Sequence, residues 1–321
     1  MKHYTDPIQA DLQAFESHFK STLRSPIPLL DVILRYLVKR KGKQLRPALV
    51  FLTARLTGLP ITERTHRGAA LVELMHTATL IHDDVVDDSP VRRGFFSINA
   101  LWKNKGAVLV GDYLLSRVLL LAVEHQDHDL LYHVSTSVKA MSEGELLQLE
   151  KARRLDIVES VYYEIIEKKT ASLMASCCGV GAASTGADAA AVEAVRRFGL
   201  ALGMAFQIAD DVLDYIGDAE TLGKNLGDDL AEGKATLPLI HALGLAKDDV
   251  RARLRLIIAT GDATAMPEVL SAITRSESLR YCTDKARFHA ESAKTALQVL
   301  PASPWKQALA DLANYSVARN H

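Results

Sequence analysis

The chain has 321 residues, of which 48% are hydrophobic and only 6% aromatic, and its formal net charge is −1. This balance excludes a nucleic-acid binder held by bulk electrostatics. The length allows a large buried core, and no Pro/Gly/Ser-rich linker divides the sequence. We therefore predict a single domain over residues 1–321.

Cysteine usage and the N-terminus bear on location. The cysteines are Cys177, Cys178 and Cys282, an odd count that argues against a disulfide framework. The first fifteen residues carry charges and lack the apolar core of a signal peptide. The longest charge-free stretch, 170–187, is too weakly apolar to cross a membrane. These features predict a soluble, cytoplasmic protein without an integral membrane segment.

Helical periodicity runs through nearly the whole chain. Residues 29–38 carry the first clear amphipathic pattern, with apolar side chains at helical spacing. Further helices are predicted at 48–57, 65–87, 108–125, 130–149, 157–180, 188–215, 236–245, 248–260, 278–299 and 304–319. Asp188 and Ser303 suit N-caps, and Pro304 suits a first helical position. The sequence offers no run of alternating strands, so we predict an all-α bundle of ten or more helices.

Two aspartate clusters follow apolar helical runs. Each reads Asp-Asp-x-x-Asp, with Asp83, Asp84 and Asp87 in the first and Asp210, Asp211 and Asp214 in the second. On a helix the first and last members of each cluster lie one turn apart, as do Asp84 and Asp88. Like charges at this spacing cost roughly 0.2–0.5 kcal/mol per pair. Mg²⁺ prefers such oxygens and completes its shell with water and substrate phosphates, so the clusters predict a magnesium-dependent diphosphate site.

Basic residues gather in the short segments that follow helix ends, at 39–47, 89–94 and 217–234. The second and third of these segments come directly after the two aspartate clusters. Loops held on a rigid scaffold are where binding groups concentrate. We therefore expect these cations to bind anionic substrate groups.

Taken in order, these motifs resemble those of the trans-type polyprenyl diphosphate synthases, most closely the bacterial long-chain, octaprenyl diphosphate synthase-like enzymes. The resemblance runs from about residue 29 to the C-terminus. Its motifs are 42–47, 76–87, 92–94, 111–113, 144–145, 169–170, 207–214, 223–224 and 233–234. It implies a single helical bundle of the isoprenoid synthase type around a central active-site cavity, and a homodimer formed through helices such as 108–125.

The family condenses isopentenyl diphosphate with an allylic diphosphate, such as farnesyl or geranyl diphosphate, in repeated trans additions. The allylic C–O bond breaks, the isopentenyl double bond attacks the resulting cation, and a proton leaves. Catalysis is then mainly electrostatic stabilisation of the departing diphosphate. By resemblance, three Mg²⁺ ions are expected: two bridged by Asp83 and Asp87 with support from Asp84, and one held by Asp210 with Asp211 and Asp214.

The resemblance also assigns substrate contacts. For the allylic diphosphate these are Arg92, Lys169, Lys224 and Lys234, and for isopentenyl diphosphate they are Lys43, Arg46, His76 and Arg93. Thr170 and Gln207 would orient the substrates and assist the cation. Catalysis is thus expected from the six cluster aspartates together with Lys169, Thr170 and Gln207.

Product length is expected to depend on the residues one helical turn before Asp83. They are Ala78 and Thr79, with Met75 deeper. Short-product relatives carry an aromatic side chain at this place. Its absence here predicts an open tunnel and an octaprenyl product for quinone side chains.

Three alternatives remain. A geranylgeranyl or farnesyl diphosphate synthase would use the same chemistry and stop earlier. A terpene cyclase needs no isopentenyl site, so the segment 42–47 and Arg93 argue against it. A regulatory subunit usually loses carboxylates from one cluster, whereas both are complete here.

Overall fold

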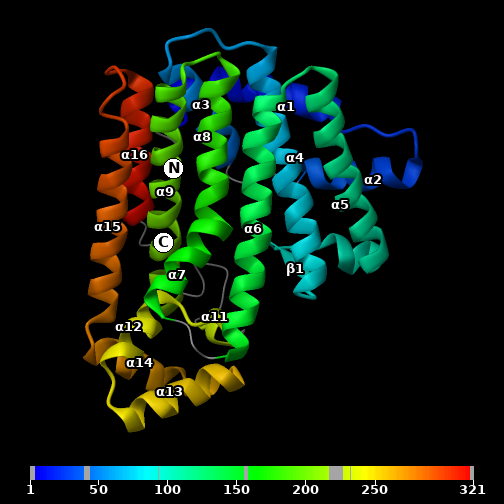
Figure 1. Ribbon diagram of the computed structural model, residues 1–321. Helices are drawn as coiled ribbons and strands as arrows, with labels where there is room; N and C mark the ends of the chain where they lie inside the picture. The colour runs from blue at the N-terminus through cyan, green and yellow to red at the C-terminus, as the bar shows by residue number, and fades with distance from the viewer. Residues whose placement is uncertain are drawn as a thin grey trace. The chain divides into compact units, whose positions relative to one another are not determined.

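The computed structural model describes residues 4–39, 44–92, 94–154, 158–216, 227–231 and 233–318. Within these ranges the regular structure is almost entirely helical, which confirms the all-α class (Figure 1). The exception there is a short antiparallel hairpin of β1 (Val91–Arg92) and β2 (Phe95–Phe96). The chain divides into two compact units, the first formed by Met1–Val138, Ser176–Arg196 and Leu297–Leu309 and the second by Lys139–Ala175, Arg197–Ala296 and Ala310–His321. The single domain stays a prediction.

The first unit is built around α4. Its own elements are η1 (Asp6–Ile8), α1 (Gln9–Thr22), α2 (Pro28–Lys39), α3 (Leu45–Leu56), α4 (Glu63–Val86) and α5 (Ile98–Glu124). Both α3 and α5 pack against α4, and α5 follows it most closely (Figure 1). Periodicity failed to predict α1 and the first turns of α5. In α5 the cause is a kink at Lys103, whose φ of 65° lies outside the helical region.

The second unit contains a π-helical turn that the periodicity of the sequence does not reveal. Its own elements are α7 (Glu159–Ile166), η2 (Glu167–Ala171), α11 (Asp228–Ala231), α12 (Leu237–Leu245), α13 (Asp248–Thr260), η3 (Ala263–Ala265), α14 (Met266–Arg275) and α15 (Ser278–Ala296). The helix predicted over 157–180 is confirmed from Glu159 onward, since α7, η2 and α8 (Ser172–Ser184) follow one another without a gap, but η2 is a π-helix, which the periodicity does not predict. Such π-helical turns are rare, and those that occur are often found at functional sites.

Four helices contribute residues to both units: α6 (His128–Arg154), α8, α9 (Ala189–Ile216) and α16 (Pro304–Ala318). The predicted caps of two of them are confirmed. Asp188 Oδ1 accepts from Ala191 N at 2.8 Å, and Ser303 Oγ accepts from Lys306 N at 3.2 Å. These bonds satisfy backbone N–H groups that have no partner within the helix.

One described helix, α5, is long and apolar enough to cross a membrane by length and composition, and 39% of its most apolar window is buried. The core helix of a soluble protein meets the same criterion. The stretch 170–187 forms the end of η2 and the largely buried α8. The absence of an integral membrane segment stays a prediction.

Candidate active site

The first aspartate cluster lies at the C-terminal end of α4. Asp87 caps the helix, and its N–H donates to Asp83 O at 2.8 Å. Asp88 has a φ of 47°, and Ser89 N donates to Asp84 O at 3.0 Å, which together form a Schellman-type ending. The predicted stacking of Asp84 and Asp88 on one helix is therefore wrong, because Asp88 has already left the helix.

Within this cluster, exposure differs from one carboxylate to the next. Asp84 is buried at 4% exposure, Asp83 is half-buried, and Asp87 is exposed. The C-terminal end of a helix carries the negative pole of its dipole, so further negative charge is unfavourable there. This end of α4 consequently favours bound cations.

Neighbouring segments fix the end of α4. Asn99 Nδ2 donates to Asp84 O at 3.0 Å, and Ser97 Oγ donates to Ser89 O at 2.7 Å. His82 Nε2 lies 3.3 Å from Val108 O on α5, so this ring contributes to helix packing. The hairpin that carries Arg92 in β1 follows directly. The Arg92 side chain and all of Arg93 lie outside what the structure describes.

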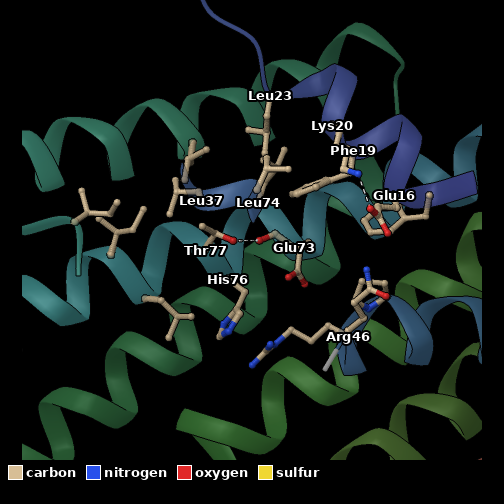
Figure 2. Close-up of a pocket in the computed structure, with 18 of the residues that line it drawn as sticks. Glu16, Phe19, Lys20, Leu23, Leu37, Arg46, Glu73, Leu74, His76 and Thr77 are labelled. Carbon is tan, nitrogen blue, oxygen red and sulfur yellow. Dashed lines mark hydrogen bonds and ion pairs between the residues drawn. The ribbon is translucent and has the colours of Figure 1, made fainter. Parts of the chain in front are cut away.

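A cavity of about 220 Å³ in the first unit adjoins the same helix. Arg46, at the start of α3, points toward the buried His76 of α4 at one side of it (Figure 2). Most of the remaining lining is apolar and comes from α1, α2, α4 and α5, including Phe15, Phe19, Leu23, Leu37, Val38, Leu74, Leu80, Ile81, Ile98 and Leu114. The cavity is thus largely apolar, with Arg46 and His76 at one side and the carboxylates of Glu16, Glu73 and Asp84 also in its lining.

The predicted product-length residues lie elsewhere on α4. Ala78 is fully buried and Met75 is 6% exposed, yet Met75, Ala78 and Thr79 do not line this cavity. Successive helical residues turn by roughly 100°, which puts Leu74 and Thr77 on another face from Met75 and Thr79. Met75 and Thr79 therefore lie on another face of α4 from the cavity, whereas Ala78, four residues after the cavity-lining Leu74, lies next to the cavity face.

The second cluster, on α9, repeats the burial pattern of the first. Asp211 is buried at 3% exposure, whereas Asp210 and Asp214 are half-buried. Both oxygens of Asp211 are used inside the second unit: Tyr162 OH donates to Oδ2 at 2.7 Å, and Gln207 Nε2 donates to Oδ1 at 2.8 Å. Thr170 Oγ1 in turn donates to Gln207 Oε1 at 2.8 Å.

Burial dominates the electrostatics of this network. It raises the pKa of Asp211 to about 7, although the hydrogen bonds from Tyr162 and Gln207 oppose the rise. Burial and the neighbouring Asp211 also hold the pKa of Tyr162 well above its usual value. The phenol therefore remains protonated and acts as a donor.

The π-helix η2 carries Lys169 and Thr170, which the sequence analysis singled out. Lys169 Nζ lies 2.6 Å from Glu145 Oε2 and 3.3 Å from Gln148 Oε1, both on α6. Gly144 allows this approach, since a Cβ there would lie 2.8 Å from Lys168 Cβ and 3.0 Å from Lys169 N. Gly203 of α9 meets Ala171 so closely that a Cβ would overlap its Cα. The π-turn is thus clamped by glycines from α6 and α9.

The remaining predicted cations are less well defined. Lys234 N donates to Asp229 O at 2.8 Å in the segment after α11, and Gly227 N donates to Asp214 O at 3.3 Å, so this segment adjoins the end of α9. Lys43 and Lys224 lie outside the described residues.

The structure thus brings Arg46 and His76 together in the first unit, and Lys169, Thr170, Gln207 and Asp211 in the second. Sequence reasoning missed Asn99 and Tyr162. No sequence signal for Tyr162 was available, because a lone tyrosine separated by 49 positions from Asp211 forms no motif.

The donor set fits Mg²⁺. In the part of the chain that the structure describes, no three His, Cys, Asp or Glu side chains gather as a protein-only metal cage. Mg²⁺ usually takes one or two carboxylates and keeps water or phosphate oxygens as its other ligands. The half-exposed outer carboxylates of each cluster satisfy that requirement.

Comparison with known proteins agrees with this geometry. Residues 27–275 match the family model described as "Polyprenyl synthetase". The chain is 40% identical to an all-trans-nonaprenyl-diphosphate synthase (geranyl-diphosphate specific) of Rhodobacter capsulatus, over 98% of this chain and 96% of that protein. It is 38% identical to the octaprenyl diphosphate synthase of Escherichia coli, over 97% and 96%. A crystal structure of a polyprenyl synthase from Caulobacter crescentus, complexed with calcium and isoprenyl diphosphate, superposes with a TM-score of 0.91 at 38% identity and covers 99% of this chain and 98% of that one.

Proposed function

We infer that this chain, which belongs to the polyprenyl synthetase family, makes octaprenyl diphosphate from isopentenyl diphosphate and an allylic primer. The enzyme class itself follows from the relatives: the chain is a trans-prenyltransferase that makes long-chain polyprenyl diphosphates. Its relatives differ in product, being nonaprenyl and octaprenyl synthases, so the product length is the proposed part. Use of the product for quinone tails and a cytoplasmic location stay predictions.

The observation that carries the product length is the small size of Ala78 and Thr79, one turn before Asp83 on α4. A methyl group and a short hydroxyl side chain leave this face of the helix without a bulky obstacle. A growing chain then extends past this point until it meets a larger side chain. Ala78 is fully buried, so a larger side chain there would displace its neighbours.

The test of product length is Ala78→Phe, with products sized by reversed-phase chromatography after dephosphorylation. We expect a shift from octaprenyl to products of a few isoprene units, with isopentenyl incorporation retained. Thr77→Phe is the matched control, because Thr77 lines the cavity beside Arg46 and His76 and lies about 100° around α4 from Ala78. An unchanged product range in Ala78→Phe, or equal shortening by Thr77→Phe, would contradict the tunnel assignment.

We propose three Mg²⁺ ions: two at Asp83 and Asp87 with Asp84 supporting, and one at Asp210 with Asp214. The calcium in the structure of the Caulobacter crescentus relative supports a divalent metal in this chain. Bound Mg²⁺ supplies positive charge that stabilises the departing diphosphate. Asp211 is buried at 3% exposure and accepts hydrogen bonds from Tyr162 and Gln207, which supports a part in orienting Gln207 rather than in binding metal directly.

The cations are proposed to divide between the substrates. Arg46 and His76 at the cavity, together with Lys43 and Arg93, hold isopentenyl diphosphate, whereas Arg92, Lys169, Lys224 and Lys234 hold the allylic diphosphate. A cavity of about 150 Å³ is enough for benzene, so the apolar body beside Arg46 and His76 has room for a five-carbon chain. This volume and the nearby Arg46 support the isopentenyl assignment.

The allylic cation is proposed to be stabilised by oxygen atoms of the second unit. The Thr170 hydroxyl uses its hydrogen on Gln207 Oε1, so its lone pairs remain available. Such fixed dipoles stabilise developing charge without reorganisation. The departing diphosphate is the proposed acceptor of the proton lost when the new double bond forms.

A homodimer through α5 is also proposed. Four apolar side chains of this helix are 49–59% exposed, namely Leu109, Leu119, Leu120 and Val123. Exposed apolar patches of this kind are typical of protein interfaces. Light scattering is expected to give twice the 35.1 kDa chain mass, and Leu119→Glu is expected to lower it. A monomeric wild-type protein would contradict the dimer.

A further inference from the structure

Tyr162 is a buried residue of the second unit that belongs to none of the sequence motifs. It is 4% exposed in α7, and its hydroxyl donates to Asp211, whose carboxylate also receives the Gln207 amide. The chain of donors then continues from Thr170 to Gln207. All three hydrogen bonds, of 2.7–2.8 Å, therefore point toward the Asp211 carboxylate: Tyr162 donates to it directly, and Thr170 donates to Gln207, which donates to it.

The Gln207 amide has one orientation in this network. Its NH₂ group donates to Asp211 Oδ1, and its oxygen Oε1 faces Thr170. Thr170 then has to donate to Oε1. With its hydrogen committed, the Thr170 hydroxyl presents only lone pairs elsewhere. A reversed amide would present N–H groups to Thr170 and turn its hydrogen outward.

On this basis we propose that Tyr162 is a positioning residue, which holds Asp211 so that Gln207 and Thr170 present oxygen rather than hydrogen to the allylic cation. The inference rests on the proposed function of Thr170 and Gln207. Tyr162 touches neither substrate nor metal in this scheme and acts only through Asp211. Because the phenol stays protonated, it keeps its donor role.

The surroundings hold both ends of this relay. Thr170 lies in the π-turn η2, which is clamped by Gly144 and Gly203. At the other end the Tyr162 ring is buried in an apolar cluster that includes Ile208, Val212 and Cys282. Neither end therefore adjusts easily if the Tyr162 hydroxyl is removed. Removing the hydroxyl therefore frees the Asp211 carboxylate to change its orientation.

The experiment uses the full chain with Mg²⁺, farnesyl diphosphate and isopentenyl diphosphate. We expect Tyr162→Phe to lower kcat about 10- to 100-fold with both KM values nearly unchanged, which is less than the roughly 100- to 1000-fold cost of removing a group that contacts the transition state directly. Without isopentenyl diphosphate the variant should also hydrolyse farnesyl diphosphate more slowly. In that reaction the C–O bond electrons leave with diphosphate, and water adds to the cation and loses a proton, giving farnesol.

Two comparisons separate positioning from folding. Tyr281→Phe is the matched control, because it also removes a tyrosine hydroxyl that donates to a carboxylate, Glu159 Oε1 at 2.5 Å. We expect it to retain wild-type kcat. In a Gln207→Leu background, Tyr162→Phe is expected to cost nothing more, since the amide it orients is gone.

Asp211→Asn tests the relay without touching Tyr162. It should lower kcat while leaving the Mg²⁺ concentration for half-maximal activity unchanged, whereas Asp210→Asn should raise that concentration. Wild-type kcat in Tyr162→Phe or Asp211→Asn, or losses that multiply in the double variant, would overturn the positioning role alone. A wild-type protein that incorporates no isopentenyl units would overturn the proposed function, and this inference with it.

Discussion

The two aspartate clusters share a sequence pattern and a burial pattern, but different surroundings hold them. In both, the second aspartate is buried and the outer carboxylates are more exposed. The first cluster ends a helix, and Asn99 and Ser89 bind the main-chain oxygen of Asp84. The second lies within α9, and Tyr162 and Gln207 bind the side chain of Asp211.

This difference teaches that one motif can be positioned by two means. Ending α4 fixes the first cluster through backbone geometry, and the helix dipole adds to its need for cations. The second cluster is fixed through a side-chain network that also reaches Thr170. We therefore expect the outer aspartates of both clusters to be needed for activity. The contacts of buried Asp84 should support the end of α4, whereas those of buried Asp211 should support the side-chain network that reaches Thr170.

The largest expected effects come from the outer carboxylates. Asp83→Asn and Asp210→Asn each remove one charge at nearly constant volume, and we expect kcat to fall about 100- to 1000-fold. Without Mg²⁺ the thermal stability should stay equal or rise slightly, because repulsion between neighbours is relieved. Steady-state rates with Mg²⁺ and melting curves without it are the measurements. Retained activity in either variant would exclude that cluster from the metal site.

Gly203→Ala is expected to have the next largest effect, and only on the second cluster. The added methyl would collide with Ala171 in the π-turn, which we expect to cost about 1–3 kcal/mol of stability and to displace Thr170. Chemical denaturation and kcat measure the two effects. Gly244→Ala in α12 is the control, since a Cβ there meets nothing within 4 Å. If Gly203→Ala matched the control, the clamp on η2 would be disproved.

Asn99→Ala tests the support of the first cluster. Removing the donor leaves Asp84 O with one fewer hydrogen bond in a buried place, a change expected to cost about 1–2 kcal/mol. The loss of kcat should be smaller than in Tyr162→Phe, because Asn99 binds the main chain and not a side chain that orients substrate contacts. Equal loss of kcat in the two variants would remove the distinction between the clusters. Denaturation and steady-state rates are the measurements.

Much of this arrangement was predictable from sequence, for identifiable reasons. Apolar residues at helical spacing predicted most of the helices. The capping roles of Asp188 and Ser303 followed from their side-chain chemistry. Local spacing gave both aspartate clusters. The π-turn η2 was not predictable, because it is defined by the backbone hydrogen bonds of Glu167–Ala171 and no residue type in that segment marks it. Tyr162 was not predictable either, because its role depends on a contact between distant parts of the chain.

The position of Asp88 leads to the smallest expected effect. This residue has no counterpart in the second cluster, where α9 continues to Ile216. Asp88 adopts a φ of 47°, which glycine tolerates better than aspartate, and its charge adds to the negative end of α4.

We expect Asp88→Gly to raise the melting temperature by about 1–3 °C, because the strain and the charge repulsion outweigh the extra freedom of the unfolded chain. Activity should remain at the wild-type level, since Asp88 lies outside the helix that aligns Asp83 and Asp87. Melting curves and steady-state rates measure both quantities, and Asp88→Ala, which removes the charge but keeps a side chain at positive φ, separates charge from backbone strain. A clear loss of kcat in both variants would instead make Asp88 a working member of the first cluster, and the comparison would then be between four carboxylates and three.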